Sequence, residues 1–231
     1  MGEFMYVNGL KRVVDFICAL AAICCLSPLL LLLAFLGTII MRGNPFFTQP
    51  RPGKDEKIFK LVKFRTMTNE RDAEGNLLPD EKRLNRYGRF LRSTSLDELP
   101  ELFNILKGDM SVIGPRPQLV RDLVFMTPEQ RKRHCVRQGL SGLAQINGRN
   151  AVSWETKIDY DLKYIEHITF WGDMKIILAT LHKAFIRADV VEENSHTATD
   201  LGDYLLASGK ITLEQYNRGQ EYAKRLIAEA G

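Results

Sequence analysis

The chain has 231 residues, which suits one compact domain plus appendages. Hydrophobic residues make up 45% and charged residues 26%, as in ordinary globular proteins, and the net charge of +4 is too small to indicate nucleic-acid binding by itself. The four cysteines show neither metal-ligand spacing nor a disulfide framework, which argues against a zinc module and fits a reducing, cytoplasmic environment.

The first feature along the chain is an apolar block, residues 13–41, that contains a single charged residue, Asp15. A block of this length is typical of a membrane-embedded segment. A signal peptide is excluded because the stretch is too long and no small-residue cleavage site follows it. Asp15 lies at a costly depth. It follows Arg12 and Lys11 by three and four residues, so structural pairing is favoured over a functional role.

Ser27 and Pro28 lie near the middle of this block. Pro28 has no amide hydrogen to donate and its ring collides with the carbonyl group of Cys24, so the helix is expected to kink or break there. The hydroxyl group of Ser27 can satisfy the freed carbonyl, which makes a break tolerable in lipid. Each half then spans roughly 20 Å, which is shorter than a hydrocarbon core of about 30 Å.

Positive charge flanks the block on both sides, with Lys11 and Arg12 before it and Arg42 and Arg51 after it. Because such residues tend to remain in the cytoplasm, both ends of the block are predicted to be cytoplasmic. Residues 11–42 are therefore predicted to form a re-entrant membrane hairpin, helix–break–helix, with a kinked single span as the alternative.

The segments after the block change in character. Residues 44–53 are rich in proline and glycine and are predicted to form a loop. Residues 57–67 mix apolar residues with cations and suit a strand, which would place Lys63 and Arg65 on one face. The polar residues 69–83 are expected to form a surface loop.

Most of the remaining chain is predicted to be helical. Residues 84–106 are expected to form helices with a break at residues 93–95, and residues 108–117 a loop with rigid proline corners. Three further predictions are a charged helix, a glycine-rich segment and one or two amphipathic helices, at residues 128–137, 139–150 and 152–187.

The C-terminal residues form a separate group. Residues 192–199 are predicted to be a polar linker, and residues 201–230 two short helices. Gly209 is expected to stop the first helix. Thr212 is expected to begin the second, with Gln215 completing a capping box.

The adjacent carboxylates of Asp97 and Glu98 are the main candidates for chemistry. Such a pair suits metal-assisted phosphoryl transfer, in which one carboxylate attacks phosphorus while the other holds Mg²⁺ or handles a proton. The alternative is structural, because Ser95 and Glu98 have the spacing of a capping box and acidic residues suit helix N-termini. Pro100 complicates that alternative, because with Ser95 as the cap it would lie where an amide donor is needed.

Two further motifs suit phosphate or sugar ligands. Pro115 and Pro117 lock the backbone around Arg116, which suits a bidentate phosphate clamp; the alternative is a rigid turn whose arginine faces water. The glycine-rich residues 139–150 offer backbone amides and polar side chains, but they lack the Walker and dinucleotide-binding patterns.

Taken in order, these motifs resemble the bacterial sugar transferases, that is, the monotopic polyprenol-phosphate phosphoglycosyl transferases. An ordered set of this kind is far more specific than any one motif. The matching motifs are KRxxD from Lys11, Ser27-Pro28, FxQxRxG from Phe47, KFRTM from Lys63, SLDELPELFN from Ser95, GDMSVIGPRP from Gly108 and GLAQINGRN from Gly142. The chain resembles a small member of the family that has the catalytic domain alone.

The resemblance implies an α+β fold that is predominantly helical. The re-entrant hairpin at residues 11–42 would be followed by a cytoplasmic catalytic domain with little β-structure at residues 43–191. Residues 1–10 would be an N-terminal lead whose first four residues are a cloning remnant, and residues 192–231 a linker and a helical extension. The implied location is the cytoplasmic face of the bacterial inner membrane.

The resemblance also implies a two-step reaction. Asp97 would attack the sugar-bearing phosphate of a UDP-sugar and release UMP, and polyprenol (undecaprenyl) phosphate would then accept the phospho-sugar. Glu98 would bind Mg²⁺ together with Asp97. The implied substrate-binding residues are Lys63, Arg65, Arg92, Arg116, Arg137, Asn147 and Arg149. The implied partners are these substrates and membrane lipids, and no nucleic acid.

Several alternatives stay open. The family usually has RPG where this chain has Arg137-Gln138-Gly139, so this turn is expected to be less rigid beside Arg137. The extension lies outside the resemblance, and a dimer-contact role that would make a homo-oligomer is a hypothesis. The rival functions are a membrane-associated nucleotide-sugar hydrolase and a non-enzymatic membrane scaffold. Release of UMP without polyprenol phosphate would favour the first, and intact function of Asp97→Asn the second.

Overall fold

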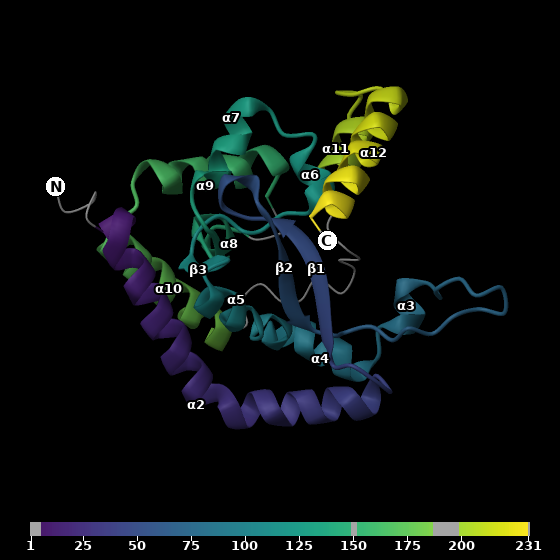
Figure 1. Ribbon diagram of the computed structural model, residues 1–231, viewed down its shortest axis with the longest axis horizontal. Helices are drawn as coiled ribbons and strands as arrows, with labels where there is room; N and C mark the ends of the chain where they lie inside the picture. Colours follow the sequence, from purple (N-terminus) through teal and green to yellow (C-terminus); the bar gives the residue numbers. More distant parts are fainter. Residues whose placement is uncertain (1–5, 149–151, 187–198, 231) are drawn as a thin grey trace.

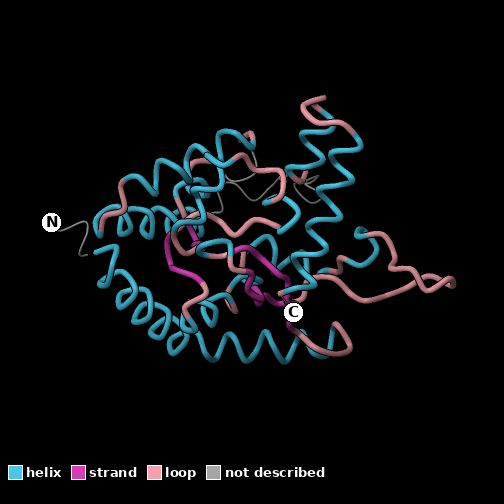
Figure 2. The backbone as a smooth tube through the Cα atoms, turned by 45° about the horizontal axis from the view of Figure 1, so that its top comes forward, coloured by secondary structure: helices cyan, strands magenta, loops and turns pink. Residues whose placement is uncertain are grey.

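The computed structural model describes residues 6–148, 152–186 and 199–230. Helices dominate these residues, and the strands form two small sheets of two strands each (Figures 1 and 2). The long N-terminal helix follows one side and the lower edge of the molecule in Figure 1, and the C-terminal helices lie at the opposite upper corner. The prediction of a mainly helical fold with little β-structure is confirmed.

The elements are short apart from four helices. In chain order they are a π-helix (Tyr6–Leu10), α2 (Lys11–Ile40), β1 (Phe46–Pro52), a 3-10 helix (Lys54–Glu56), β2 (Ile58–Phe64), α3 (Asp80–Arg83), α4 (Arg86–Thr94), a 3-10 helix (Leu96–Glu98), α5 (Glu101–Lys107), β3 (Met110–Ile113), α6 (Val120–Leu123), α7 (Pro128–Arg131), a 3-10 helix (Lys132–Cys135), β4 (Gln138–Ser141), α8 (Leu143–Ile146), α9 (Trp154–Glu166), α10 (Phe170–Ile186), α11 (Leu201–Ala207) and α12 (Leu213–Glu229).

Helix α2 is the only described helix that is long and apolar enough to cross a membrane, with a mean hydropathy of 2.7 in its most apolar window. The helix continues through Pro28, so the predicted break is wrong and a kink takes its place. Figures 1 and 2 show the sharp bend near the middle of α2. The Ser27 hydroxyl donates a hydrogen bond of 2.9 Å to the Cys24 carbonyl, as predicted, and this satisfies the acceptor that Pro28 cannot serve.

Both halves of α2 pack on the rest of the protein. Ala19 in the first half joins a core cluster with Leu61 of β2 and Ile105 of α5. Leu30 and its neighbour Leu33 in the second half join a cluster with Phe64 and Leu91. On the opposite face large apolar side chains are exposed, with Leu31 at 72% and Phe35 at 64%. One face of α2 therefore covers the domain, and the other is apolar and suits lipid.

Asp15 is a structural residue, as favoured by the sequence. It is 4% exposed and accepts hydrogen bonds from the Ser111 hydroxyl at 2.6 Å and the Val112 amide at 3.0 Å. Its distance to Lys11 Nζ is 3.7 Å. Arg12 donates instead to the carbonyl groups of Ile105 and Leu106. These contacts attach the start of α2 to β3 and α5.

The predicted loop at residues 44–53 is wrong, because strand β1 occupies most of it. β1 pairs antiparallel with β2, with Gln49 opposite Leu61. Because β1 has no second neighbouring strand, its prolines Pro50 and Pro52 remove no ladder hydrogen bond that the sheet needs. The predicted strand at residues 57–67 is confirmed as β2, although it ends at Phe64.

The predicted loop at residues 108–117 is also wrong in part, because it contains β3. This strand pairs parallel with β4. The backbones at Gly114 and Gly139 approach each other closely because neither residue has a side chain. A Cβ atom at Gly139 would lie 2.1 Å from the Gly114 nitrogen, which is too close. The Gly139 amide donates to the Pro115 carbonyl at 2.8 Å, and the Gly114 amide to the Ser141 carbonyl at 2.9 Å. A four-residue strand with a distant partner has no periodicity from which to predict it.

The predicted helices agree better with the structure. The amphipathic region forms α9 and α10. The charged helix at residues 128–137 is shorter than predicted, since α7 passes into a 3-10 helix that ends at Cys135. Helices α11 and α12 are confirmed, as is the capping box of Thr212 and Gln215. The predicted linker lies outside the described residues apart from Thr199.

Candidate active site

The two candidate carboxylates lie between α4 and α5. Helix α4 stops at Thr94 because Ser95 takes up a left-handed conformation with φ of 56°, so the predicted break is confirmed. The Ser95 side chain does not cap the 3-10 helix Leu96–Glu98. The capping-box alternative is therefore wrong. Pro100 stands at the N-cap of α5, where its missing amide hydrogen costs little.

Glu98 is held by two cations. Lys63 Nζ lies 2.8 Å from its Oε1 atom, and Arg116 binds both oxygens, with Nη1 at 3.3 Å from Oε2 and Nη2 paired with Oε1. Burial alone would raise the pKa of Glu98, but the charges of Arg116 and Lys63 outweigh it and hold this pKa well below its usual range. Glu98 is therefore an ionised carboxylate of fixed orientation.

Lys63 also reaches a third carboxylate, Glu101, which the sequence did not single out. Lys63 Nζ lies 3.1 Å from Glu101 Oε1, and that oxygen is buried without a well-aligned hydrogen bond. Burial raises the pKa of Glu101 to about 7. Burial lowers the pKa of Lys63, but Glu98 and Glu101 outweigh it, and the net shift is upward. Lys63 is therefore the charged centre between two carboxylates.

Asp97 differs from its neighbours. Within the described part of the chain its carboxylate makes no hydrogen bond and no ion pair, and it is only partly buried. Burial, followed by the negative charge of Glu98, raises the pKa of Asp97 to about 6, against the opposing effects of Lys63, Arg116 and Arg92. The oxygens of Asp97 are thus uncommitted and lie next to fixed positive charge.

The segment that carries Arg116 is anchored by a buried ion pair. Arg133 is fully buried and lies 2.7 Å from Asp161. The same guanidinium group donates to the Arg116 carbonyl at 2.6 Å. The side chain of Arg116 is 39% exposed and pairs with Glu98, whose charge raises the pKa of Arg116. The alternative of a turn whose arginine only faces water is therefore wrong, and the role as a phosphate clamp stays a prediction.

Arg51 is a second residue that the sequence reasoning did not place in the site. Its guanidinium donates to the Pro117 carbonyl at 3.1 Å and to Gln49 Oε1 at 2.7 Å, while its Nε atom is buried without a partner. Burial, and then the charge of Arg116, lowers the pKa of Arg51 to about 10. Arg51 belongs to the motif FxQxRxG, so the sequence could have indicated its role. Because residues 44–53 were predicted to form a loop, strand β1, which directs Arg51 toward residues 116–117, was missed.

The other predicted substrate-binding residues are further from the carboxylate cluster or only border it. Arg92 donates to Thr66 Oγ1 at 3.1 Å and acts on Asp97 by its charge. Three others bind backbone carbonyl groups: Arg65 binds that of Phe46, Arg137 that of Gly108, and Asn147 that of Leu143. Arg149 lies outside the described residues. Substrate binding by these side chains stays a prediction.

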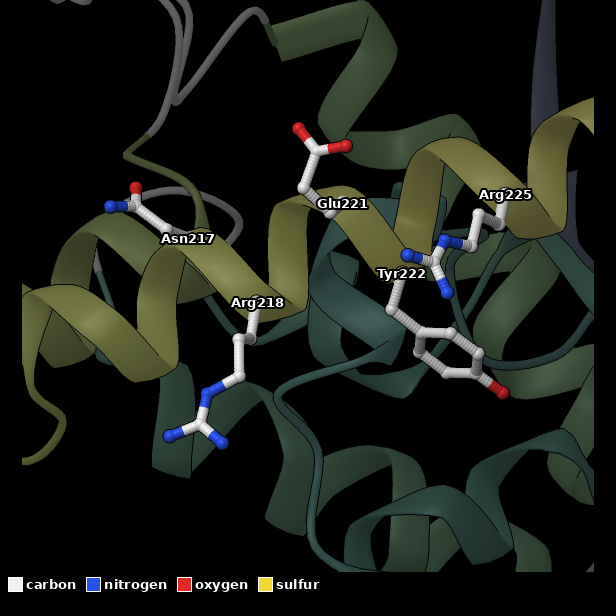
Figure 3. Close-up of a pocket in the computed structure, with 5 residues that line it drawn as sticks. All are labelled: Asn217, Arg218, Glu221, Tyr222 and Arg225. Atoms are coloured by element: carbon white, nitrogen blue, oxygen red, sulfur yellow. The ribbon is translucent and has the colours of Figure 1, made fainter.

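Two surface hollows lie elsewhere on the molecule. Figure 3 shows the larger one, about 430 Å³, along the exposed face of α12, where it is lined by Asn217, Arg218, Glu221, Tyr222 and Arg225. The second, about 190 Å³, lies between β1–β2 and the end of α12. Neither is lined by Asp97 or Glu98. Lys63 and Arg116, the cations beside these carboxylates, are both paired with Glu98.

The carboxylate oxygens of Asp97 and Glu98 are suitable ligands for a magnesium ion at an open site. Among the described residues no three His, Cys, Asp or Glu side chains are arranged to hold a metal by themselves. Mg²⁺ is usually bound through one or two carboxylates, with substrate phosphates and water completing its shell. The uncommitted Asp97 beside the ionised Glu98 fits that arrangement and not a closed protein cage.

Comparison with known proteins places this constellation in a family. The family model for bacterial sugar transferases matches residues 6–187, which include α2, both carboxylates and the Arg116 segment. The chain belongs to the bacterial sugar transferase family. The resemblance drawn from the ordered motifs is therefore confirmed, and the matched part of this sugar transferase ends before α11.

Individual relatives give the same assignment. The sugar transferase is 46% identical over 189 residues to the uncharacterized sugar transferase EpsL of Bacillus subtilis, a match of 82% of this chain and 94% of EpsL. It is 41% identical over 194 residues to a UDP-glucose:undecaprenyl-phosphate glucose-1-phosphate transferase of Klebsiella pneumoniae, covering 78% of this chain and 42% of that protein. An Aeromonas hydrophila UDP-N-acetylgalactosamine-undecaprenyl-phosphate N-acetylgalactosaminephosphotransferase is 38% identical over 180 residues, covering 74% and 43%. The chain thus spans nearly all of EpsL but less than half of the other two.

Proposed function

We propose that this sugar transferase moves a phospho-sugar from a UDP-sugar to a polyprenol phosphate through a covalent intermediate on Asp97. The observation that carries the proposal is the contrast between two adjacent carboxylates. Glu98 is fixed and ionised by Lys63 and Arg116, whereas Asp97 has no hydrogen-bonding or ion-pair partner among the described residues. An uncommitted carboxylate beside fixed cations is the group suited to attack phosphorus.

The reaction balances in two displacements. An Asp97 oxygen forms a bond to the sugar-bearing phosphorus, the bond from that phosphorus to the bridging oxygen breaks, and UMP leaves with the electron pair. An oxygen of polyprenol phosphate then attacks the same phosphorus and restores the Asp97 carboxylate, giving a polyprenyl diphosphate sugar. Lys63, Arg92 and Arg116 would neutralise the phosphate oxygens at each step.

Asp97 and Glu98 are the residues that would hold Mg²⁺, and the bound ion would supply positive charge for the leaving group. Glu98 contributes to such a site because Lys63 and Arg116 fix the direction of its carboxylate. The family relatives support the substrate classes: their names state transfer of a sugar phosphate to undecaprenyl phosphate from UDP-glucose in one case and from UDP-N-acetylgalactosamine in another.

The position of Asp97 relative to α2 supports a lipid acceptor. Leu96 and Leu99 flank Asp97 and Glu98, and both pack against the cluster that Leu30 and Leu33 of α2 form with Phe64 and Leu91. The segment that carries Asp97 therefore shares an apolar cluster with α2. We infer that α2 enters the membrane from the cytoplasmic face and returns, which would bring a lipid phosphate and a soluble nucleotide to one carboxylate.

The test is chemical detection of the intermediate. The enzyme is mixed with a panel of UDP-sugars and Mg²⁺, quenched in acid and analysed by mass spectrometry. We expect a phospho-sugar adduct on Asp97, and we expect Asp97→Asn to lose the adduct and at least about 10³-fold in turnover. Asp80→Asn, on the exposed helix α3, is the control that should keep both. Full turnover by Asp97→Asn would overturn the proposal.

A nucleotide-sugar hydrolase is the rival that shares these residues. The products separate the two functions. A transferase releases about one UMP per enzyme without polyprenol phosphate and turns over only when the lipid is added. A hydrolase releases UMP and free sugar phosphate continuously in the absence of the lipid.

A further inference from the structure

The C-terminal residues 199–230 lie outside the family match, yet they pack closely on the catalytic domain. The ring of Phe125, just after α6, is enclosed by two glycines of the extension. A Cβ atom at Gly202 or at Gly219 would lie 2.5 Å from that ring. Tyr216 of α12 stacks on Phe125 with ring centroids 5.9 Å apart. Figure 1 shows α11 and α12 side by side next to α6.

Polar contacts make the docking specific. The Leu201 amide donates to Asp122 Oδ1 at 2.9 Å, and Asp200 forms an ion pair with Arg121. The extension also reaches α9, where Trp154 Nε1 donates to the Thr199 carbonyl at 2.9 Å. Because these contacts involve backbone groups as well as side chains, they fix the position of α11 relative to α6 and α9.

Helix α6 ends the segment that carries Arg116. Asp122 is 1% exposed, and its second oxygen accepts the Leu119 amide at 2.9 Å, so this side chain joins the end of the segment to the extension. Between Arg116 and Leu119, the Pro117 carbonyl accepts a hydrogen bond from Arg51. The start of the segment is fixed independently, by the Gly114 amide on the Ser141 carbonyl.

We propose that the extension, residues 199–230, positions the Arg116 segment, and that Asp122 is the positioning residue through which it acts. A buried carboxylate that loses the Leu201 amide is left with an unsatisfied oxygen, which favours movement of α6 toward water. Such movement releases Leu119 and loosens the backbone that aims the Arg116 guanidinium. The proposal rests on the proposed function only where Arg116 is said to contact the donor phosphate.

The test displaces the extension in the full-length enzyme. Gly219→Val places a branched side chain against the Phe125 ring, and valine is no worse than glycine in a helix, so α12 itself should persist. Asn217→Val is the matched control, because residue 217 is exposed on the same helix. Amide hydrogen exchange of residues 116–123 is measured together with affinity for UDP.

In Gly219→Val we expect faster exchange at residues 116–123 and affinity for UDP that is weaker by about tenfold, with little change in the control. In turnover assays the KM for the UDP-sugar should rise more than that for polyprenol phosphate. Asp122→Asn, which keeps the side-chain volume, should give the same pattern with α12 still docked.

Two results would overturn the proposal. The first concerns amide hydrogen exchange in Gly219→Val. If exchange in α12 shows that the extension has detached but exchange at residues 116–123 is unchanged, the extension does not position this segment, whatever the activity of the enzyme. The second is a loss of active enzyme with unchanged KM for the donor, which is the result that a merely stabilising role predicts. If the parent enzyme neither binds UDP nor uses UDP-sugars, the proposed function fails, but the exchange result still decides the positioning role.

Discussion

At the scale of residues, the environment separates two neighbouring carboxylates into different roles. Asp97 and Glu98 are adjacent in the chain, but only Glu98 faces Lys63 and Arg116. The charges of these cations lower the pKa of Glu98, whereas burial and the charge of Glu98 raise the pKa of Asp97 to about 6. Paired titratable groups whose pKa values are pushed apart are typical of catalytic sites.

This difference predicts the pH dependence of the first step. In the proposed mechanism Asp97 must be ionised to attack, so adduct formation should fall as the pH drops through about 6. Glu98→Gln removes the negative charge that raises the pKa of Asp97 and frees two cations that lower it. The acid limb should therefore shift to lower pH, even though the rate is reduced.

The measurement is the rate of adduct formation by rapid quench between about pH 4.5 and 8. Glu56→Gln is the control, because Glu56 pairs with Arg131 and does not act on Asp97. Its acid limb should coincide with that of the parent. If the acid limb of the pH–rate profile of Glu98→Gln stays in place or moves to higher pH, the charge of Glu98 does not raise the pKa of Asp97.

At the scale of elements, the bend of α2 lets one helix cover two parts of the domain. Its first half packs on β2 and α5, and its second half on β2 and α4. A straight helix of 30 residues would be about 45 Å long and could not follow both surfaces. Pro28 supplies the bend, and the Ser27 hydroxyl satisfies the Cys24 carbonyl that the bend frees.

Pro28→Leu should therefore straighten α2. The amide hydrogen of the introduced leucine would complete the hydrogen-bond ladder, and the straight helix would be long enough to span a bilayer. We expect the N-terminal end to become accessible from the periplasm and activity to fall by at least about tenfold. Cysteine labelling at residue 3 and at residue 70 measures the topology.

Pro79→Leu is the control for loss of a proline, since Pro79 lies at the N-cap of the short helix α3. It should leave both the labelling and the activity near parent values. Periplasmic labelling of residue 3 in the parent enzyme would show that α2 spans the membrane even with the bend.

At the scale of the whole molecule, a buried ion pair connects α9 to the segment that carries Arg116. Arg133 is fully buried between Asp161 and the Arg116 carbonyl. Breaking a buried pair by removal of one partner typically costs about 3–5 kcal/mol, because the other charge is left unpaired. Stability and the position of Arg116 therefore depend on the same side chain, and a double variant can separate them.

Arg133→Met should lower the melting temperature by roughly 10 °C. Arg133→Met combined with Asp161→Leu should recover most of this loss, because no unpaired charge remains. The double variant still lacks the donor to the Arg116 carbonyl, so its KM for the UDP-sugar should stay raised. Thermal unfolding and steady-state kinetics measure the two effects.

Arg131→Met is the matched control, because its pair with Glu56 is partly exposed, and its loss should cost less than about 1 kcal/mol. Recovery of both stability and the donor KM in the double variant would show that Arg133 does not position the Arg116 backbone.

Much of this architecture follows from local signals. The proline and serine in the apolar block predicted the kink and its hydrogen bond, and residues 93–95 predicted the end of α4. Thr212 and Gln215 predicted the start of α12. In each case the interacting groups lie within four residues of one another, so a short stretch of sequence is enough to predict the interaction.

The sequence by itself determined the family, the apolar helix and the pair of candidate carboxylates. Only the tertiary structure decided that β1 and β3 are strands and that Glu98 is held while Asp97 is left uncommitted. The partners of Glu98 are 35 and 18 residues away, and β4 follows β3 by more than twenty residues. Contacts of such separation depend on how the whole chain folds, and no local pattern contains them.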